Sequence, residues 1–405
     1  MFWLRLVVVV VGGGFVAATL LPFSPMTLKL YMPSRQLMIT LHRHRVGLRA
    51  VGLMLMSVLL ILAIAGEAPA RWGWITGGLL AFFAVFFLTG YVPVVMRPPP
   101  VDRAMSASEA DEIVTGDTDV LGIFADGEAK AYARGQLARP HIFTDEIGGH
   151  QVAITYCILC NTAMAFRSEL DDKPLRLRAV SAYNNNIIYH DADSGDYIQQ
   201  LDAGVISGPD SGKQLEPLQV TISSWDSWKS MHPDSGYVDL PPTGIRDKMM
   251  SRMLDWMIPL EGLSARKKPW HPVKGSLDRA LDQMEMVVGV AIAEEDRAYP
   301  VRALADRWVI NDTLGGEPIV VMYDPRLDTT GVFSRRCDGE VLDFNSGDSP
   351  GIGVADDRTR WDITGAEVTA DGTRQGRQLD TIPHFGKLFW FSWSVFKPDT
   401  TISAS

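Results

Sequence analysis

Two cysteines, Cys157 and Cys160, are the residues of this sequence whose types and spacing point most clearly to chemistry. They directly follow a strand predicted over 151–156 and are separated by two apolar residues. Thiols at this spacing can occupy two positions of a tetrahedral metal site or form a reversible disulfide. A zinc finger needs a second such pair, but Cys337 is the only other cysteine, so further ligands must be of another type.

Two histidines, His141 and His190, are the predicted partners of the cysteines in a metal site. Both lie in the same part of the chain as Cys157 and Cys160, one before the pair and one on a later predicted strand. Two thiolates and two imidazoles form a soft ligand set that suits a zinc or copper ion in tetrahedral coordination. The first hypothesis is therefore a metal-binding protein with these four residues as ligands.

Two further hypotheses stay open. In the second, the protein is a thiol–disulfide oxidoreductase in which Cys157 is the nucleophile and Cys160 the resolving thiol, which requires an exposed Cys157 with a depressed pKa. In the third, the thiols are buried and inert, and the chain is a non-catalytic binding or assembly module whose membrane part engages a membrane-protein partner. Whether the protein is an enzyme stays open at this point.

Two segments that resemble catalytic or nucleotide-binding motifs fail on physical grounds. The segment Gly208–Lys213 resembles a phosphate-binding loop, but it has three residues between its glycines instead of four, and Gln214 replaces the hydroxyl that binds Mg²⁺. The segment Gly347–Gly351 matches a nucleophile elbow, but Pro350 has no backbone N–H to donate to an oxyanion. We therefore expect no nucleotide cofactor and interpret both segments as turns.

The elements that must position the cysteines belong to an internal repeat. Residues 120–166 and 287–333 align without a gap at an offset of 167, with 13 of 47 positions identical. Each copy predicts short strands, a Gly-Gly turn and one or two helical turns. We therefore predict an α+β, mainly β, internally duplicated domain with pseudo-two-fold symmetry. Asp324 and Leu327 replace the two cysteines in the second copy, so only the first copy keeps the thiols.

Three apolar runs predict an N-terminal membrane anchor. They span roughly 6–23, 50–66 and 72–96, close to or above the about 20 residues that a helix needs to cross a bilayer. We therefore predict a multi-pass protein of the cell (inner) membrane, with the lipid bilayer as a partner. The predicted organisation is an anchor of three transmembrane helices over 1–97, a Pro-rich linker over 98–115, a first repeat unit with the cysteines over 116–240, a helical connector over 241–283 with an amphipathic helix at 245–258, and a degenerate second unit over 284–405.

The charge pattern separates the anchor from the rest of the chain. Residues 1–97 carry eight Lys or Arg and one acid, Glu67, whereas residues 98–405 carry 30 basic and 47 acidic residues. This acidic body argues against nucleic acid as a partner, because phosphate binding needs a basic face. Five basic residues lie between the first and second apolar runs, so the positive-inside rule favours a cytoplasmic body.

Several motifs of the body occur together, namely TDEIGG, VAITYCILCNTAMAF, YNNNIIYHDADSGD, GPDSGKQLEPL, SSWDSWKSMHPD and the terminal FWFSWSVFKPDT. In this combination, over residues 115–400, the chain resembles the DUF3179 family, whose function is unknown. The chain departs from the family pattern at Pro140-His141, where the family usually has His-Glu, and at Ile158, where it has Pro. Family members are mostly exported or lipid-anchored, so the resemblance implies an extracytoplasmic body, against the charge pattern. We expect the extracytoplasmic side.

Overall fold

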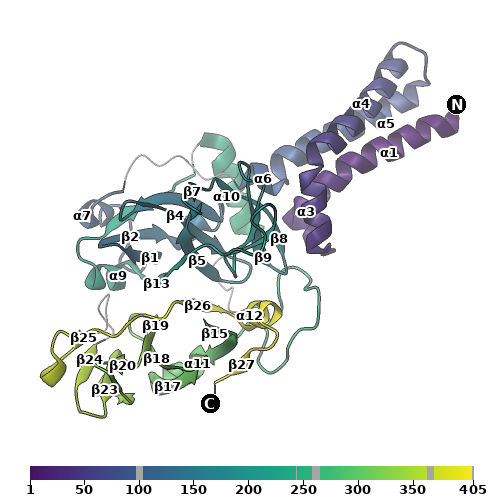
Figure 1. Ribbon diagram of the computed structural model, residues 1–405. Helices are drawn as coiled ribbons and strands as arrows, with labels where there is room; N and C mark the ends of the chain where they lie inside the picture. The colour runs from purple at the N-terminus through teal and green to yellow at the C-terminus, as the bar shows by residue number, and fades with distance from the viewer. Residues whose placement is uncertain (97–103, 243, 258–264, 363–368, 404–405) are drawn as a thin grey trace.

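Long helices at the N-terminus project from a body made of β-sheets (Figure 1). The computed structural model describes residues 1–96, 104–242, 244–257, 265–362 and 369–403. The long helices are α1 (Phe2–Leu20), α4 (Arg45–Ile64) and α5 (Ala70–Thr89). By length and composition, three segments of this described part are apolar enough to cross a membrane: Phe2–Phe23, Arg45–Ile64 and Ala70–Thr89. This finding supports the predicted association with a membrane.

The first two long helices approach closely where each carries a glycine. A Cβ atom on Gly52 of α4 would lie 2.5 Å from the carbonyl oxygen of Gly12 on α1, so a larger residue at position 52 would force the helices apart. Small residues at such crossings are typical of helix pairs in a bilayer. Gly12 and Gly52 therefore allow α1 and α4 to pack closely.

Short elements between and after the long helices pack on the body. They are η1 (Leu21–Phe23), α2 (Pro25–Leu28), α3 (Arg35–Arg43) and α6 (Val92–Val95). Ser181 Oγ of β8 (Leu177–Tyr183) donates a hydrogen bond to the Pro22 carbonyl at 3.1 Å. Arg43 Nη2 donates to Ser207 Oγ of β11 (Gly204–Ser207) at 3.0 Å. The loop between the first two long helices therefore lies at the end of the bundle that contacts the body.

The first half of the body carries the two cysteines. Its remaining elements are α7 (Ala107–Ala110), β1 (Asp119–Ala125), β2 (Glu128–Ala133), α8 (Arg134–Leu137), β3 (Ile142–Ile147), β4 (His150–Cys157), β5 (Thr162–Arg167), β6 (Glu169–Leu170), β7 (Lys173–Pro174), β9 (Asn186–Asp191), β10 (Tyr197–Gln199), β12 (Pro217–Leu218), β13 (Thr221–Ser224), α9 (Trp225–Met231) and β14 (Gly236–Val238). The sheets have the strand orders β13-β1-β2-β14, β12-β5-β4-β3, β11-β10-β9-β8 and β6-β7.

The second half is also mainly β. Its elements are β15 (Met286–Ile292), β16 (Glu295–Pro300), α11 (Val301–Arg307), β17 (Val309–Leu314), β18 (Glu317–Asp324), β19 (Thr329–Ser334), β20 (Arg336–Cys337), β21 (Glu340–Val341), β22 (Phe344–Ser346), β23 (Ile352–Ala355), β24 (Arg360–Asp362), β25 (Thr369–Ala370), η3 (Gly372–Arg374), β26 (His384–Phe389), α12 (Trp390–Phe396) and β27 (Thr401–Ile402). The sheets have the orders β26-β15-β16-β27, β17-β18-β19, β20-β21 and β22-β23-β24-β25.

Some contacts recur between the halves at the offset of 167 residues. In each half, a central hairpin pairs with an antiparallel strand on one side and a parallel strand on the other. Tyr132 OH donates a hydrogen bond to Asp145 Oδ2 at 2.7 Å, and Tyr299 OH donates to Asp312 Oδ2 at 2.7 Å. These central sheets therefore share their strand order and a tyrosine–aspartate contact.

The connector contains the helix α10 (Gly244–Met257), where the sequence predicts an amphipathic helix over 245–258. Position 258, like linker positions 98–103, lies outside the described residues. The largest hydrophobic core joins the end of the anchor to the first half and includes Phe389 and Phe391 of the second half. The cysteine site therefore lies where these parts of the chain meet.

Candidate functional site

The two cysteines lie at the ends of a tight turn between β4 and β5. Cys157 is the last residue of β4 and pairs with Thr162 of β5, and both thiols are 0% exposed. Asn161 closes the turn with a φ of +53°, a conformation that asparagine tolerates better than most residues. Tyr156 OH donates to Asn161 Oδ1 at 2.8 Å. The turn is therefore held in one conformation from inside the protein.

The two sulfur atoms have different partners. Cys157 Sγ donates a hydrogen bond to the Asn185 carbonyl at 3.2 Å. Cys160 Sγ accepts from Asn186 Nδ2 at 3.5 Å, and it lies 3.8 Å from the Cys157 carbonyl, to which its own S–H donates when protonated. Cys157 is thus placed as a protonated donor, whereas Cys160 receives a proton donor.

The pKa values of the two thiols move in opposite directions. Burial raises the pKa of Cys157 well above its usual range, and the neighbouring Cys160 raises it further. Burial also acts to raise the pKa of Cys160, but hydrogen bonds from Cys157, Thr162, Asn186 and Ser392 outweigh it and lower that pKa to about 7. Of the two thiols, Cys160 is therefore the one that ionises more readily, next to a Cys157 that stays protonated.

Two buried hydroxyl groups lie beside Cys160. Thr162 Oγ1 and Ser392 Oγ are buried and form no hydrogen bond among the described residues, and both hydroxyls lie near enough to the Cys160 sulfur to lower its pKa. A buried hydroxyl without a partner is costly, so groups of this kind stabilise a negative charge at little further cost. The arrangement therefore favours a thiolate at Cys160.

The amide of Asn186 is oriented by its neighbours. Gln199 Nε2 and the backbone N–H of Leu201 donate to Asn186 Oδ1 at 2.7 and 3.0 Å. This leaves Asn186 Nδ2 to donate to Gln200 Oε1 at 3.0 Å and to the sulfur. Asn186, Thr162 and Ser392 escaped the sequence analysis. The run of three asparagines at 184–186 was the available signal, because such a run marks a hairpin turn.

His141, predicted as a metal ligand, has a structural contact of its own. Its Nδ1 bonds the carbonyl of Tyr156 at 2.9 Å, and burial lowers its pKa to about 4. The ring is therefore neutral, with Nδ1 as the donor to the carbonyl. His141 thereby supports the strand that leads into the cysteine turn.

His190, the other predicted ligand, lies at the junction between the anchor and the body. Its ring centroid is 5.0 Å from that of His42 in α3 and 4.6 Å from that of Tyr197. Burial, together with Arg45, lowers the pKa of His190 to about 4. Its ring contacts are thus with the anchor and β10.

No group of three or more His, Cys, Asp or Glu side chains in the described part of the chain is arranged to hold a metal ion. The structure therefore gives no support to a metal site made of Cys157, Cys160, His141 and His190. The physical reason is that both imidazoles are engaged elsewhere. The condition set for the redox alternative, an exposed Cys157 with a depressed pKa, is also not met, because Cys157 is buried and its pKa is raised.

In the second half, the place of the thiols is taken by an ion pair. Asp324, at the position that corresponds to Cys157, is fully buried and bonds Arg326 Nη2 at 2.9 Å. Arg326 also donates its backbone N–H to Asp324 Oδ1 at 2.8 Å. This turn is satisfied internally and offers no thiol chemistry.

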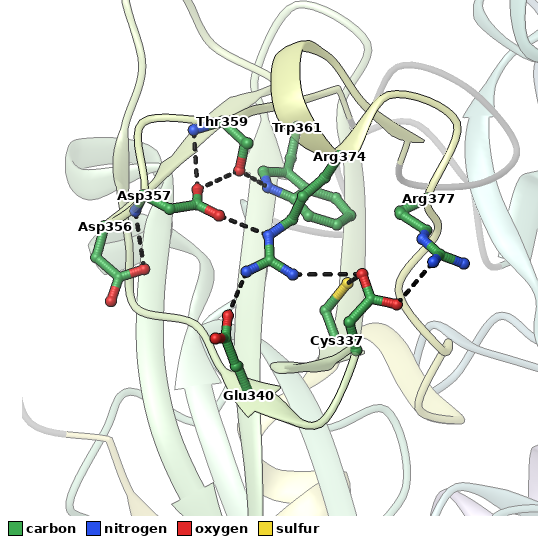
Figure 2. Close-up of polar contacts among 9 residues, drawn as sticks. Cys337, Glu340, Asp356, Asp357, Thr359, Trp361, Arg374 and Arg377 are labelled. Atoms are coloured by element: carbon green, nitrogen blue, oxygen red, sulfur yellow. Dashed lines mark hydrogen bonds and ion pairs between the residues drawn. The ribbon is translucent and has the colours of Figure 1, made fainter.

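The second half also contains a cluster of charged side chains around Arg374 (Figure 2). The guanidinium of Arg374 contacts the carboxylates of Asp338 and Glu340 in the β20–β21 hairpin and of Asp357 between β23 and β24. Although partial burial acts to raise it, the contacts with Arg374 and Thr359 lower the pKa of Asp357 to about 2. Each nitrogen of the guanidinium donates to a carboxylate of the protein, so we infer that the cluster stabilises the fold and does not bind a ligand.

Cys337 lies at the edge of this charged cluster. Its Sγ is 3.7 Å from Asp338 Oδ2, and burial, together with the negative charge of Asp338, raises its pKa. It therefore has the opposite environment to Cys160 and provides an internal control for thiol reactivity.

Comparison with known proteins identifies the body of the chain. The family model described as "Protein of unknown function (DUF3179)" matches residues 91–400. No curated protein and no solved structure matches the chain. The match includes the whole cysteine site.

Proposed function

The chain belongs to the DUF3179 family, and we propose that its Cys157–Cys160 pair is a thiol–disulfide redox centre in a membrane-anchored protein. The observation that carries this proposal is the convergence of buried donors on Cys160. A thiol is most effective in exchange when its pKa lies near the ambient pH, and the pKa of Cys160 is lowered to about 7. Compared with the sequence-based hypothesis, the two roles are exchanged: Cys160 is the nucleophile and Cys157 the resolving thiol.

In the proposed reaction the two thiols reduce a substrate disulfide. In the reverse direction, the Cys157–Cys160 disulfide oxidises two substrate thiols. The Cys160 thiolate attacks one sulfur of a substrate disulfide, forms a mixed disulfide and releases the first substrate thiolate, which takes up a proton. Cys157 then loses its proton and attacks Cys160 Sγ, which releases the second substrate thiol. The products are a Cys157–Cys160 disulfide and two substrate thiols, so two electrons pass from the protein to the substrate.

The burial of both thiols implies that the substrate must be small or that the site must open. Asn184 and Asn185 bind the backbone of the connector, through Lys274 N at 2.8 Å and His271 N at 2.7 Å. These contacts tie the connector to the turn that carries Asn186, the donor to Cys160. We propose that the connector moves away when the side chains of Asn184 and Asn185 release its backbone, and that this motion gives a substrate access to the sulfurs.

We also propose that the two halves are copies of one unit and that the second copy supports the first. The shared strand order and the recurring tyrosine–aspartate contact support this proposal. Ser392 of the second half contributes to the lowered pKa of Cys160 in the first half. A second copy without thiols would thereby retain a role in the site.

We propose that the anchor is multi-pass and that the body lies on the extracytoplasmic side. The basic residues that favour the cytoplasm by the positive-inside rule have structural partners. Lys29 Nζ lies 4.0 Å from the centroid of the Trp270 ring, and Arg43 bonds Ser207 at 3.0 Å. These basic residues therefore contribute to the packing of the anchor on the body, so their number need not indicate the orientation of the chain in the membrane.

A redox titration tests the proposed function. The full chain with Cys337→Ser is placed in lipid nanodiscs, equilibrated in dithiol–disulfide buffers, quenched with acid and measured by mass spectrometry. We expect a reversible loss of two hydrogens that is absent from the Cys157→Ser and Cys160→Ser variants in the same background. Failure to form the disulfide in any buffer would overturn the proposal.

The same samples test the predicted zinc or copper ion, which stays the alternative. Their metal content is measured without chelator and after reconstitution. Near-stoichiometric metal that disappears in the Cys157→Ser/Cys160→Ser double variant, together with thiols that resist oxidation, would favour the metal site instead.

A further inference from the structure

A cavity of about 200 Å³ lies between the cysteine turn, the connector and the anchor. Its apolar lining comes from short segments next to the membrane helices and from the first half, and it includes Leu28, Val92, Met96, Ile158, Leu159 and Leu240. Ile158 and Leu159 are the two residues between the cysteines. The cavity therefore borders both the predicted membrane surface and the candidate site.

The polar group in this cavity that lacks partners is the ring of His271. This ring is 2% exposed, and neither Nδ1 nor Nε2 has a hydrogen-bond partner among the described residues. The residue is nevertheless fixed, because the Asn185 side chain bonds both its backbone N–H and its carbonyl, at 2.7 and 3.0 Å. A neutral imidazole offers one donor and one acceptor, and buried groups of this kind are almost always paired.

We propose that this cavity binds a neutral amphipathic molecule from the bilayer, with a hydroxyl head at His271 and an apolar chain along Leu28 and Met96. A hydroxyl can donate to the bare nitrogen of a neutral ring or accept from its N–H, and because the two nitrogens face different sides of the ring, it satisfies one of them. The proposal is independent of the redox reaction, because the ligand occupies the space beside the turn and need not react with the sulfurs.

The charges of the cavity favour a head without net charge. Burial and Lys29 lower the pKa of His271 to about 3, and burial lowers that of His141, which also lines the cavity, to about 4. Both rings are therefore neutral at physiological pH. Of the charged residues in the lining, Arg139 is paired with Asp247 at 3.6 Å, and Asp255 is acidic, so the lining offers no unpaired cation to an anionic head.

The size and position of the cavity favour a membrane component. An apolar cavity of about 150 Å³ holds a molecule the size of benzene, so this one has room for a hydroxyl head and the first few carbons of a chain. The remainder of the chain would follow the lining residues of α2 and the segment after α5, which adjoin the membrane helices.

Photolabelling tests this proposal with the full chain in nanodiscs. The probe is decanol that carries a diazirine on its chain, and the labelled peptides are mapped by mass spectrometry. We expect labelling of the peptides that contain Leu28, Met96 and Ile158, suppressed by excess decanol but not by decane. Decanoate, which is charged at pH 8, should compete at least about tenfold less well.

Matched variants separate the cavity from the lipid-facing surface. Leu28→Trp should fill the cavity and abolish labelling of these peptides, whereas Leu30→Trp, at a site that is 84% exposed, should not. His271→Phe should reduce labelling and His271→Gln should retain part of it. Labelling that decane suppresses as well as decanol, that decanoate suppresses equally, or that survives in Leu28→Trp would overturn the proposal. An absence of label from these peptides, with water as the partner of His271, would overturn it as well.

Discussion

Asn161 and Asp328 are 167 residues apart in the chain, yet both contact Lys387. Asn161 Nδ2 donates a hydrogen bond to the Lys387 carbonyl at 2.7 Å, and Lys387 Nζ donates to the Asp328 carbonyl at 2.7 Å. Each also accepts a hydrogen bond from the tyrosine five residues before it, Tyr156 at 2.8 Å and Tyr323 at 2.9 Å. The turn with the cysteines and its counterpart without them are therefore linked through one strand, β26.

This relationship has a consequence for Cys160. The strand that contains Lys387 continues into α12, and the backbone N–H of Phe389 donates to the Cys160 carbonyl at 3.2 Å. Ser392 then lies near enough to the sulfur to lower its pKa. The half of the body that lacks the thiols therefore completes their environment.

Removal of a donor should raise the pKa of Cys160. A hydroxyl near the sulfur favours the thiolate, so Ser392→Ala should leave more of the thiol protonated and lower the thiolate fraction at pH 7 about two- to threefold. The measurement is ultraviolet thiolate absorbance against pH in the Cys337→Ser background. Ser394→Ala is the matched control, because Ser394 is also a buried serine of α12 without a hydrogen-bond partner in the described residues. An equal effect of both variants would contradict this account.

The glycines beside two buried tryptophans should be equally intolerant of substitution. A Cβ atom on Gly122 would lie 2.2 Å from the Trp228 ring, and one on Gly289 would lie 2.5 Å from the Trp393 ring. Overpacking of this kind costs about 1–3 kcal/mol, so each alanine variant should lower the free energy of unfolding by at least this amount. Chemical denaturation measures it.

The control for these alanine variants is Gly204→Ala. A Cβ atom at this position meets its nearest neighbour at 3.7 Å, an ordinary contact. A loss of stability as large as that in Gly122→Ala would show that the tryptophan contact is not the cause.

Arg374 should stabilise the second half much more than its neighbour Arg377. Arg374→Ala leaves three carboxylates without their shared cation, and a loss of about 1–3 kcal/mol in the free energy of unfolding is expected. Arg377 has a side chain that is 61% exposed and pairs with Asp338 at 3.1 Å, so Arg377→Ala should change the free energy by less than about 0.5 kcal/mol. Near-equal losses would contradict the structural role of the cluster.

The effect of Arg374 should also depend on pH. Asp357 has a pKa lowered to about 2 in the folded protein, below its ordinary value of 3.8. Its contribution is therefore present above about pH 4 and is lost as the pH falls towards 2. The difference between Arg374→Ala and the unchanged chain should shrink over the same interval.

The side of the membrane can be read from single cysteines introduced into a chain that carries Cys157→Ser, Cys160→Ser and Cys337→Ser. Glu295→Cys places an exposed thiol in the body, and Glu67→Cys places one in the loop between α4 and α5, at the opposite end of the bundle from the body. With intact cells and an impermeant maleimide, we expect labelling of Glu295→Cys but not of Glu67→Cys. The reverse pattern would place the body in the cytoplasm.

Local patterns in the sequence predicted the long helices and part of the first half. The apolar runs indicated the three long helices, and the Gly-Gly turn indicated the strand that follows it, β4. The position of the histidines could not be predicted in this way. His141 has a φ of +60° after a short helix, and Trp308 has a φ of +62° at the corresponding place in the second half. The backbone at this point suits either residue, so the presence of an imidazole there carried no information about a metal.

The environment of Cys160 was also beyond the reach of sequence patterns. Its donors come from β5, β9 and α12, and they are brought together by tertiary packing alone. The motif indicated which two thiols could react, but the order of their pKa values depends on these distant partners. For this reason the sequence-based hypothesis chose Cys157 as the nucleophile.

The rate of mixed-disulfide formation with glutathione disulfide tests the central claim most directly. Two variants of the full chain are compared between about pH 6 and pH 9, Cys157→Ser/Cys337→Ser, which keeps Cys160, and Cys160→Ser/Cys337→Ser, which keeps Cys157. Both remaining thiols are buried in the same turn, so any opening of the site serves both. We predict that Cys160 reacts at least about tenfold faster at neutral pH and reaches half of its maximal rate at a lower pH than Cys157 does, although Cys157→Ser replaces one of the groups that lower the pKa of Cys160. Equal rates, or a faster reaction at Cys157, would contradict the account.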